Sequence, residues 1–180
     1  MEVPLSDLGD IADSLDLENQ VCFALVVASR SVIAVYRPLL EPMGLTHPQY
    51  LVMLALWQHA PSSVKDLSRL LQLEPATLSP LLKRLETSGF VHRPRDREDE
   101  RSLAVTLTPA GWRLRNEAEK IPAAIVGRLG MELAELQHLH HVLTRVIAAA
   151  NEANTSHRAV RGQVSAPYGA LPQAEPRRPG

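Results

Sequence analysis

"VKDLSRLLQLEPATLSPLLKRLETSGFVHRPRDREDERSLAVTLTPAG", residues 64–111, is the stretch of sequence that decides the fold. Its first half contains two short helical patterns, and the second pattern ends at Gly89, where a helix commonly stops. Its second half alternates apolar and polar residues on both sides of a highly charged turn, which is typical of a β-hairpin. Two short helices followed by such a hairpin predict a winged helix-turn-helix.

Helix-start signals and apolar periodicity predict the remaining elements. Three pairs of residues match such start signals: Thr46 with Gln49, Ser63 with Asp66, and Thr108 with Pro109. Apolar residues at three- and four-residue steps predict an amphipathic helix over residues 17–40 that ends near Pro38. The helix after Thr108 is expected to run to about Leu129 with a kink at Pro122, and Gly130 separates it from a last helix with an apolar stripe. The sequence therefore predicts a mostly α fold with a two-stranded β wing.

Charge and composition exclude several classes of protein. The 19 Lys and Arg residues against 20 Asp and Glu residues give a formal net charge of −1, so contact with nucleic acid must depend on local charge. The first residues are acidic where a signal peptide is basic, and no apolar run reaches the roughly 18 residues that span a bilayer. We therefore expect a cytoplasmic protein without a membrane partner. The single cysteine, Cys22, excludes an internal disulfide.

The order of these elements resembles the MarR family of dimeric winged-helix repressors over residues 17–153. The segment "DERSLAVTLTPAG", which contains Asp99 and Arg101, is similar to the wing signature of that family. Four further segments resemble the branch of the family that senses organic hydroperoxides through one cysteine in the first helix: "LENQVCFALVVASR", "VYRPLLEPMGLT", "PQYLVMLALW" and "ATLSPLLKRLE".

The resemblance implies a homodimer that binds a pseudo-palindromic operator in double-stranded DNA and represses transcription. It implies dimerisation helices at residues 17–41 and 109–153 and a DNA-binding region at about 46–108. Apolar stripes on the first and last helices agree with this, because a stripe of that width needs a partner and a symmetric operator needs a two-fold axis. Residues 1–16 are expected to be a flexible segment and residues 154–180 a disordered tail. No cofactor is expected.

The wing and the second short helix carry the residues expected to contact DNA. Arginine suits a wing tip because a narrow minor groove concentrates negative potential, and the family pattern implies that Asp99 orients Arg101. Hydroxyls near the start of the helix can reach bases or phosphates, and cations one turn later can contact phosphates or a guanine. Pro80 predicts an irregular first turn or a regular helix that begins near Ser79. The predicted DNA-binding residues are Thr77, Ser79, Lys83, Arg84, Arg95, Arg97, Asp99 and Arg101.

Cys22 is the redox sensor that the resemblance implies. Tyr36 follows it by 14 residues, about 21 Å along one helix, so the two side chains can meet only across two chains whose first helices cross antiparallel. The phenol would then stabilise the thiolate that attacks a peroxide. The family pattern has tyrosines where this chain has Val26 and His47. His47 can still donate to the sulfur or, when protonated, lower the pKa of the thiol.

Oxidation of Cys22 by an organic hydroperoxide requires a second thiol to resolve the sulfenic acid. The chain has no second cysteine, and Gly127 stands where some relatives carry one. A low-molecular-weight cellular thiol is therefore the expected partner. A mixed disulfide at the dimer interface would change the spacing of two recognition helices, which must match half-sites about one DNA turn apart.

Three other functions remain open from the sequence. A repressor released by a phenolic or other amphipathic ligand, bound between the dimerisation and DNA-binding regions, needs no cysteine chemistry. An enzyme would be a thiol peroxidase that uses Cys22, or a metal enzyme that uses His138, His140 and His141, of which only the first and third share a helix face. A protein-interaction module that keeps the dimer without binding DNA would fit the near-neutral charge.

Overall fold

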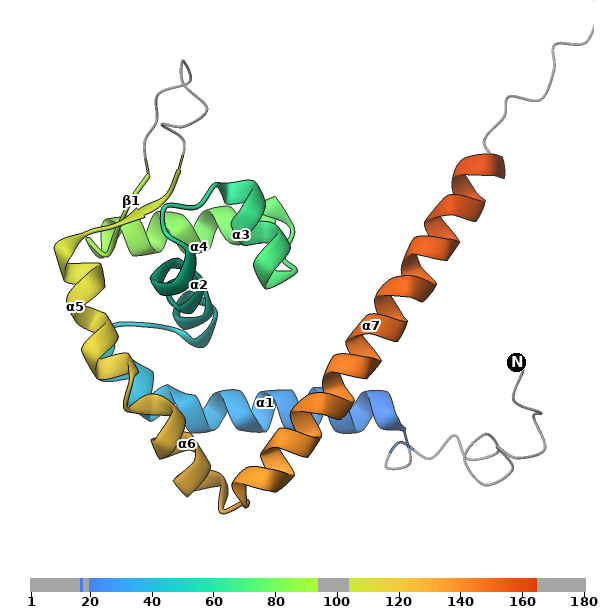
Figure 1. The fold of residues 1–180 in the computed structure, drawn as a ribbon, viewed down its shortest axis with the longest axis horizontal. Helices are drawn as coiled ribbons and strands as arrows, with labels where there is room; N and C mark the ends of the chain where they lie inside the picture. The colour runs from blue at the N-terminus through green and yellow to red at the C-terminus, as the bar shows by residue number, and fades with distance from the viewer. Residues whose placement is uncertain (1–16, 18–19, 94–103, 165–180) are drawn as a thin grey trace, which may run out of the picture. The chain divides into compact units, whose positions relative to one another are not determined.

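The computed structural model describes residue 17, residues 20–93 and residues 104–164, with side chains up to residue 155. The elements in chain order are α1 (Val21–Leu40), η3 (Glu41–Met43), α2 (His47–His59), α3 (Val64–Leu71), α4 (Pro75–Thr87), β1 (Val91–His92), β2 (Thr106–Leu107), α5 (Pro109–Ala118), α6 (Ile121–Leu129) and α7 (Leu133–Val164) (Figure 1). β1 and β2 form an antiparallel pair in which Val91 is opposite Leu107. The described residues confirm the predicted class, a mostly α fold with a two-stranded wing.

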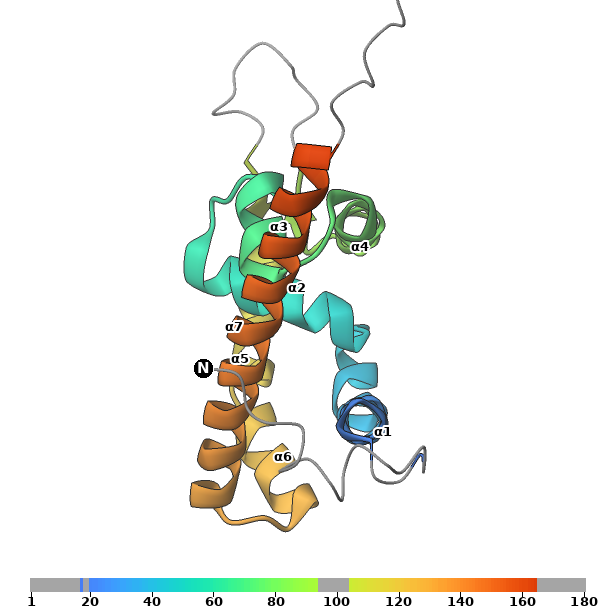
Figure 2. The same ribbon diagram turned by 90° about the vertical axis from the view of Figure 1, so that its right-hand side faces the viewer.

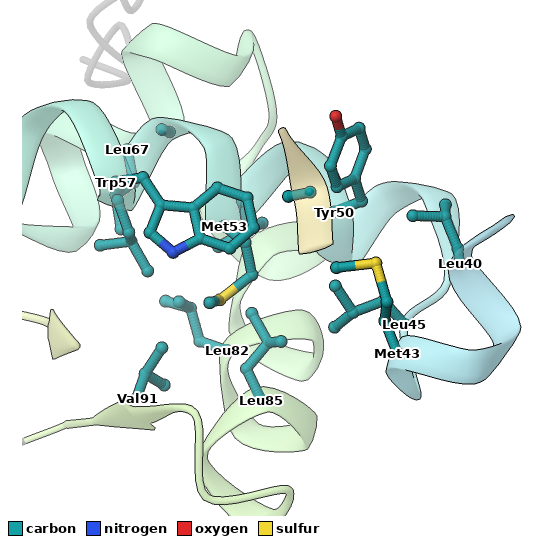
Figure 3. Packing of buried hydrophobic residues seen from close by; sticks show 14 of the residues in the cluster. Leu40, Met43, Leu45, Tyr50, Met53, Trp57, Leu67, Leu82, Leu85 and Val91 are labelled. Carbon is teal, nitrogen blue, oxygen red and sulfur yellow. The ribbon is translucent and has the colours of Figure 1, made fainter. Parts of the chain in front are cut away.

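The hydrophobic core lies between α2, α4 and the base of the wing. Figure 3 shows Met53 of α2 close to Leu82 and Leu85 of α4, with Val91 of β1 nearby. These side chains are almost completely buried. α3 packs against both α2 and α4, and Figures 1 and 2 show α3 and α4 side by side. The predicted helix-turn-helix is therefore anchored on one central apolar helix, α2.

The three predicted helix starts are confirmed by their hydrogen bonds. The backbone N–H of Thr46 donates to Gln49 Oε1 (2.8 Å). The backbone N–H of Asp66 donates to Ser63 Oγ (3.1 Å), and that of Gly111 donates to Thr108 Oγ1 (3.0 Å). Each of these bonds satisfies a backbone donor that a helix N-terminus leaves without a partner inside the helix. The caps thus fix where α2, α3 and α5 begin.

α1 begins later than the sequence pattern suggests, and its end agrees with that pattern. It starts at Val21 rather than at residue 17, and it continues through Pro38 to Leu40. The predicted end near Pro38 is confirmed to within two residues, because the ring removes one N–H without preventing a last helical turn. Gly44, with φ of 67°, then turns the chain towards α2.

The predicted kink at Pro122 is a complete break between two helices. α5 ends at Ala118 and α6 begins at Ile121. Ala118 is the residue whose carbonyl would accept a helical hydrogen bond from position 122, and proline has no N–H to donate. One proline therefore produces two separate helices here.

Close contacts join the base of the wing to α2 and to the start of α5. Thr108 Oγ1 donates to the carbonyl of Gly89 (2.7 Å), and Trp57 Nε1 donates to the carbonyl of Gly111 (2.9 Å). A Cβ atom on Gly111 would lie 2.1 Å from the carbonyl oxygen of Phe90, so only glycine fits. A backbone bridge between Ser62 and Val105, which the sequence did not predict, adds a further link to the loop before α3.

α1 exposes much of its apolar surface. Val21, Leu25, Val26, Val27 and Ile33 are exposed, and Leu40 is the one residue of this helix that is buried. By length and composition alone, Val21–Met43 could cross a membrane: over an 18-residue window its mean hydropathy is 1.5, and 6% of that window is buried. Arg30 and Arg37 divide this segment, so the sequence contains no uninterrupted apolar run there. An exposed apolar surface of this extent is typical of a surface that contacts another protein or a membrane.

The chain divides after Gly130 into two compact units, and α7 belongs to the second. α7 exposes Leu133, Leu139, Val142, Val146 and Ile147. It continues to Val164, beyond Asn154, where the sequence prediction placed the start of a disordered tail. That prediction was based on the loss of apolar periodicity after Asn154, which indicates that a segment does not pack against a core. A helix can continue without such packing, and residues 151–164 contain no proline to end it.

Candidate nucleic-acid interface and cysteine site

α4 has one buried side and one exposed side. Its buried side is formed by Leu78, Leu82 and Leu85, of which the last two point towards Met53 in Figure 3. The exposed side consists of Ala76, Thr77, Pro80, Lys83, Arg84 and Thr87. We call this set the outer face of α4. It lies on the second helix of the helix-turn-helix, which is the helix that enters the major groove in such motifs.

The outer face of α4 carries two cations. Within the described part of the chain, neither Lys83 nor Arg84 forms an ion pair. Glu86, the nearest carboxylate on the same turn, is half-buried. The chain has almost no net charge, but this local surface is positive, as contact with phosphates requires.

The predicted DNA-binding residues of α4 do not all share this face. Thr77, Lys83 and Arg84 are exposed, whereas Ser79 is half-buried on the flank. The sequence-based prediction depended on residue type and took no account of the helical angle between the residues. It also left out Ala76 and Pro80, because neither has a polar side-chain group.

Pro80 lies inside α4, and the helix is regular from Pro75 onwards. The predictions of an irregular first turn, or of a start near Ser79, were therefore wrong. Proline inside a helix costs about 3 kcal/mol relative to alanine, because it removes a hydrogen bond to the residue four positions earlier. Since Pro80 is exposed, packing in the core does not offset this cost.

The arginines of the wing fall outside the described residues. Arg95, Arg97, Asp99 and Arg101 all belong to residues 94–103, so their predicted roles stay predictions. The strands that lead to them are described, and they place Arg93, a half-buried residue that the sequence reasoning did not select, directly after β1.

Cys22 lies in the first turn of α1, and its side chain is exposed. Tyr36 is on the same helix, about 21 Å further along its axis at 1.5 Å per residue. The structure therefore keeps the two apart within one chain, as the sequence predicted.

Tyr36 and His47 come together within one chain. Their ring centroids are 5.0 Å apart, and the rings meet edge to face at 70°. Tyr50 of α2 adds a third ring, 6.1 Å from that of Tyr36. The sequence reasoning selected the first two residues for contact with a cysteine but missed their contact with each other and missed Tyr50. The spacing of His47 and Tyr50, one helical turn apart on α2, was the available signal.

Partial burial sets the protonation of these rings. It raises the pKa of Tyr36, so this phenol stays protonated and is a hydrogen-bond donor at neutral pH. It lowers the pKa of His47 below the ordinary value of 6.5, so this imidazole is neutral at pH 7. His47 can donate a hydrogen bond at neutral pH, but it does not supply a positive charge.

Two pockets adjoin α1. One, of about 460 Å³, lies beside His47 and has apolar walls that include Ile33 and Leu45 and one cation, Arg37. The other, of about 430 Å³, lies between the end of α1 and the α5–α6 segment, with Met43 and Ile121 in its wall. Both volumes are within the range of pockets that bind small molecules.

A comparison with protein families matches residues 45–103 to the model of the MarR family. The chain is also 39% identical over 142 residues to the organic hydroperoxide resistance transcriptional regulator of Bacillus subtilis, a match that covers 79% of this chain and 97% of the relative. The chain belongs to the MarR family. It is a DNA-binding transcriptional regulator of the winged helix-turn-helix type and not an enzyme.

Solved structures of similar proteins have the same fold. AbfR of Staphylococcus epidermidis, in a reduced form bound to DNA, is 36% identical with a TM-score of 0.65, over 76% of this chain and 94% of that one. CouR of Rhodococcus jostii RHA1, bound to p-coumaroyl-CoA, is 25% identical with a TM-score of 0.61, over 74% and 95%. The solved structures similar to this chain thus include one with DNA and one with a small molecule. Among the described residues, no group of three or more His, Cys, Asp or Glu side chains could hold a metal ion.

Proposed function

We propose that this MarR-family protein is a homodimeric repressor that binds a pseudo-palindromic operator in double-stranded DNA in the cytoplasm. We propose further that oxidation of Cys22 by an organic hydroperoxide releases it from the operator. The carrying observation is the exposed Cys22 on α1 of a chain that is 39% identical to an organic hydroperoxide resistance regulator.

For DNA binding, the outer face of α4 enters the major groove. Lys83 contacts phosphate, and Arg84 contacts phosphate or a guanine edge, which arginine can bind through two hydrogen bonds. Thr77 supports them from about two turns earlier, and Ser79 reaches a phosphate from the flank. Both cations are exposed and without an ion pair among the described residues, so they are available to a negatively charged partner.

The wing adds contacts in the minor groove. Arg95, Arg97 and Arg101 are the proposed contacts, and Asp99 orients Arg101. Arg97→Ala or Arg101→Ala is expected to weaken operator binding and to leave the dimer folded. Unchanged affinity at physiological salt would remove the wing from the mechanism.

The exposed apolar side of α1 is proposed to face a second copy of the chain, rather than lipid. Two α1 helices that cross antiparallel would bring Cys22 of one chain near Tyr36 and His47 of the other. Tyr36, which burial keeps protonated, would then donate a hydrogen bond to the sulfur and favour the thiolate. His47 would act in the same way as a neutral donor, because burial disfavours its charged form.

The proposed chemistry has two steps. The thiolate of Cys22 attacks one peroxide oxygen, the O–O bond breaks, an alcohol leaves after it takes up a proton, and the sulfur becomes a sulfenic acid. A low-molecular-weight thiol then forms a mixed disulfide with the sulfur, and water leaves. The added group at the dimer interface would change the separation of the two α4 helices, which must match half-sites about one DNA turn apart.

The test is DNA release after treatment with an organic hydroperoxide and a small thiol, with the wild type and Cys22→Ser in parallel. We expect the wild type to release DNA and to gain the mass of the thiol at Cys22. The variant should bind DNA as well as the untreated wild type and should stay bound. Equal release by both proteins, or release by neither, rejects the switch but leaves DNA binding intact.

A second candidate is a repressor released by a small amphipathic ligand. It is favoured by the 430 Å³ pocket between α1 and the α5–α6 segment. CouR, a relative at 25% identity, was solved with p-coumaroyl-CoA. Release of DNA by such a ligand from both the wild type and Cys22→Ser would support this candidate.

A further inference from the structure

The apolar part of the outer face of α4 is unexplained by phosphate contacts. Ala76, Thr77 and Pro80 are exposed, with Pro80 one turn and the other two about two turns before Lys83 and Arg84. Pro80 follows Ala76 by four residues and Thr77 by three, so the three side chains are neighbours on the helix surface. Pro80 likewise precedes Lys83 and Arg84 by three and four residues. It therefore occupies the middle of the surface that faces DNA.

We propose that Pro80, together with the methyl groups of Ala76 and Thr77, contacts the 5-methyl groups of thymines in the major groove. This inference rests on the DNA binding proposed above and adds to it the kind of base pair that each half-site must contain. The thymine methyl is the one apolar group that a base pair presents in the major groove, and apolar side chains recognise it by contact.

Two observations favour this assignment over a surface that merely stays in contact with water. Pro80 weakens the helix, and because it is exposed it gains nothing from the core. In addition, the pyrrolidine ring presents only carbon and hydrogen at the centre of a face that cations flank. Such a ring cannot hydrogen-bond to the edge of any base, so a thymine methyl is the group that it can recognise.

The chain offers a matched control in the same helix. Pro75 is also exposed, but it is five residues from Pro80 and therefore about 140° away around the helix axis. Pro75→Ala and Pro80→Ala make the same chemical change on different sides of α4. Both variants should fold, since alanine is the best helix former. Pro80→Ala should also raise the melting temperature, which checks that the helix is intact.

The experiment first selects binding sites with the full-length protein from a pool of short random DNA duplexes. An enriched duplex is then made again with deoxyuridine in place of individual thymines, which removes only the 5-methyl group. We expect affinity to fall about fourfold at each contacted thymine, since burying one methyl group contributes about 0.8 kcal/mol. Pro80→Ala should reduce this loss to less than about twofold, and Pro75→Ala should leave it at the wild-type value.

Three outcomes contradict the inference in different ways. If no duplex is enriched, the proposed DNA binding fails, and this inference fails with it. If the wild type binds an enriched duplex but tolerates deoxyuridine at every thymine of both half-sites, DNA binding stands and the thymine contact is wrong. If Pro80→Ala discriminates thymine from uracil as well as the wild type does, Pro80 is not the residue that makes the contact.

Discussion

α4 and α1 are helices of the same compact unit, but α4 buries its apolar side within a single chain and α1 leaves most of its apolar side exposed. α4 has 13 residues and buries Leu78, Leu82 and Leu85 within one chain, while its outer face remains exposed. α1 has 20 residues and buries only Leu40. The difference teaches that the proposed DNA-reading surface is built by one chain, whereas the proposed sensor around Cys22 requires a second one.

The largest effect, on the free energy of unfolding, is expected from a change on the buried side of α4. Leu82 is fully buried, so Leu82→Ala should lower the free energy of unfolding by about 2–5 kcal/mol through lost burial and a cavity. Leu70→Ala, at a position that is 50% exposed on α3, is the control and should change it by less than about 0.5 kcal/mol. Chemical denaturation measures both, and equal effects would contradict the packing described for α4.

The next effect concerns the uncovered side of α1. Val26→Asp should raise the dissociation constant of the dimer about 100-fold, or about 2.7 kcal/mol, because a charge would be buried between two copies. The same change should leave the helical circular dichroism unaltered, since Val26 is exposed in one chain. Sedimentation at several protein concentrations decides the matter, and an undisturbed dimer would remove α1 from the interface.

A smaller effect is expected on the outer face of α4. Arg84→Ala should weaken DNA binding by about 1–3 kcal/mol, about 5- to 150-fold, and reduce its salt dependence. Arg69→Ala is the matched control, because Arg69 on α3 is already paired with Asp66 at 3.2 Å. Binding titrations at several salt concentrations compare the two variants. If Arg69→Ala has the larger effect, α3 rather than α4 is the main contact.

The smallest effect concerns the pH dependence of stability at His47. Burial lowers the pKa of His47 in the folded state below its unfolded value of about 6.5, so the unfolded state binds the proton more readily. The contribution is fully present above about pH 6.5, and it is lost as the pH falls through the folded value. The melting temperature of the wild type should therefore fall more between about pH 7 and pH 5 than that of His47→Gln. Identical profiles would mean that His47 is not kept neutral by burial.

How well the sequence predicted each region follows from the range of the interactions involved. The starts of α2, α3 and α5 depend on bonds between residues three apart, such as Thr46 with Gln49, and these were read correctly. The bridge between Ser62 and Val105 and the Tyr36–His47 contact join residues distant along the chain, and no local pattern reports them. The family resemblance identified Cys22, which is exposed in the single chain. The other half of the proposed site would come from a second chain.

The glycine at the start of α5 has a mechanical consequence. Its backbone lies so close to the carbonyl of Phe90 that no methyl group fits between them, and its own carbonyl accepts the indole N–H of Trp57. The base of the wing has no hinge at this joint, because rotation there would force atoms to overlap and would break a buried hydrogen bond. The described strands and α5 are therefore expected to move together, so that a tilt of α5 would also tilt β1 and β2.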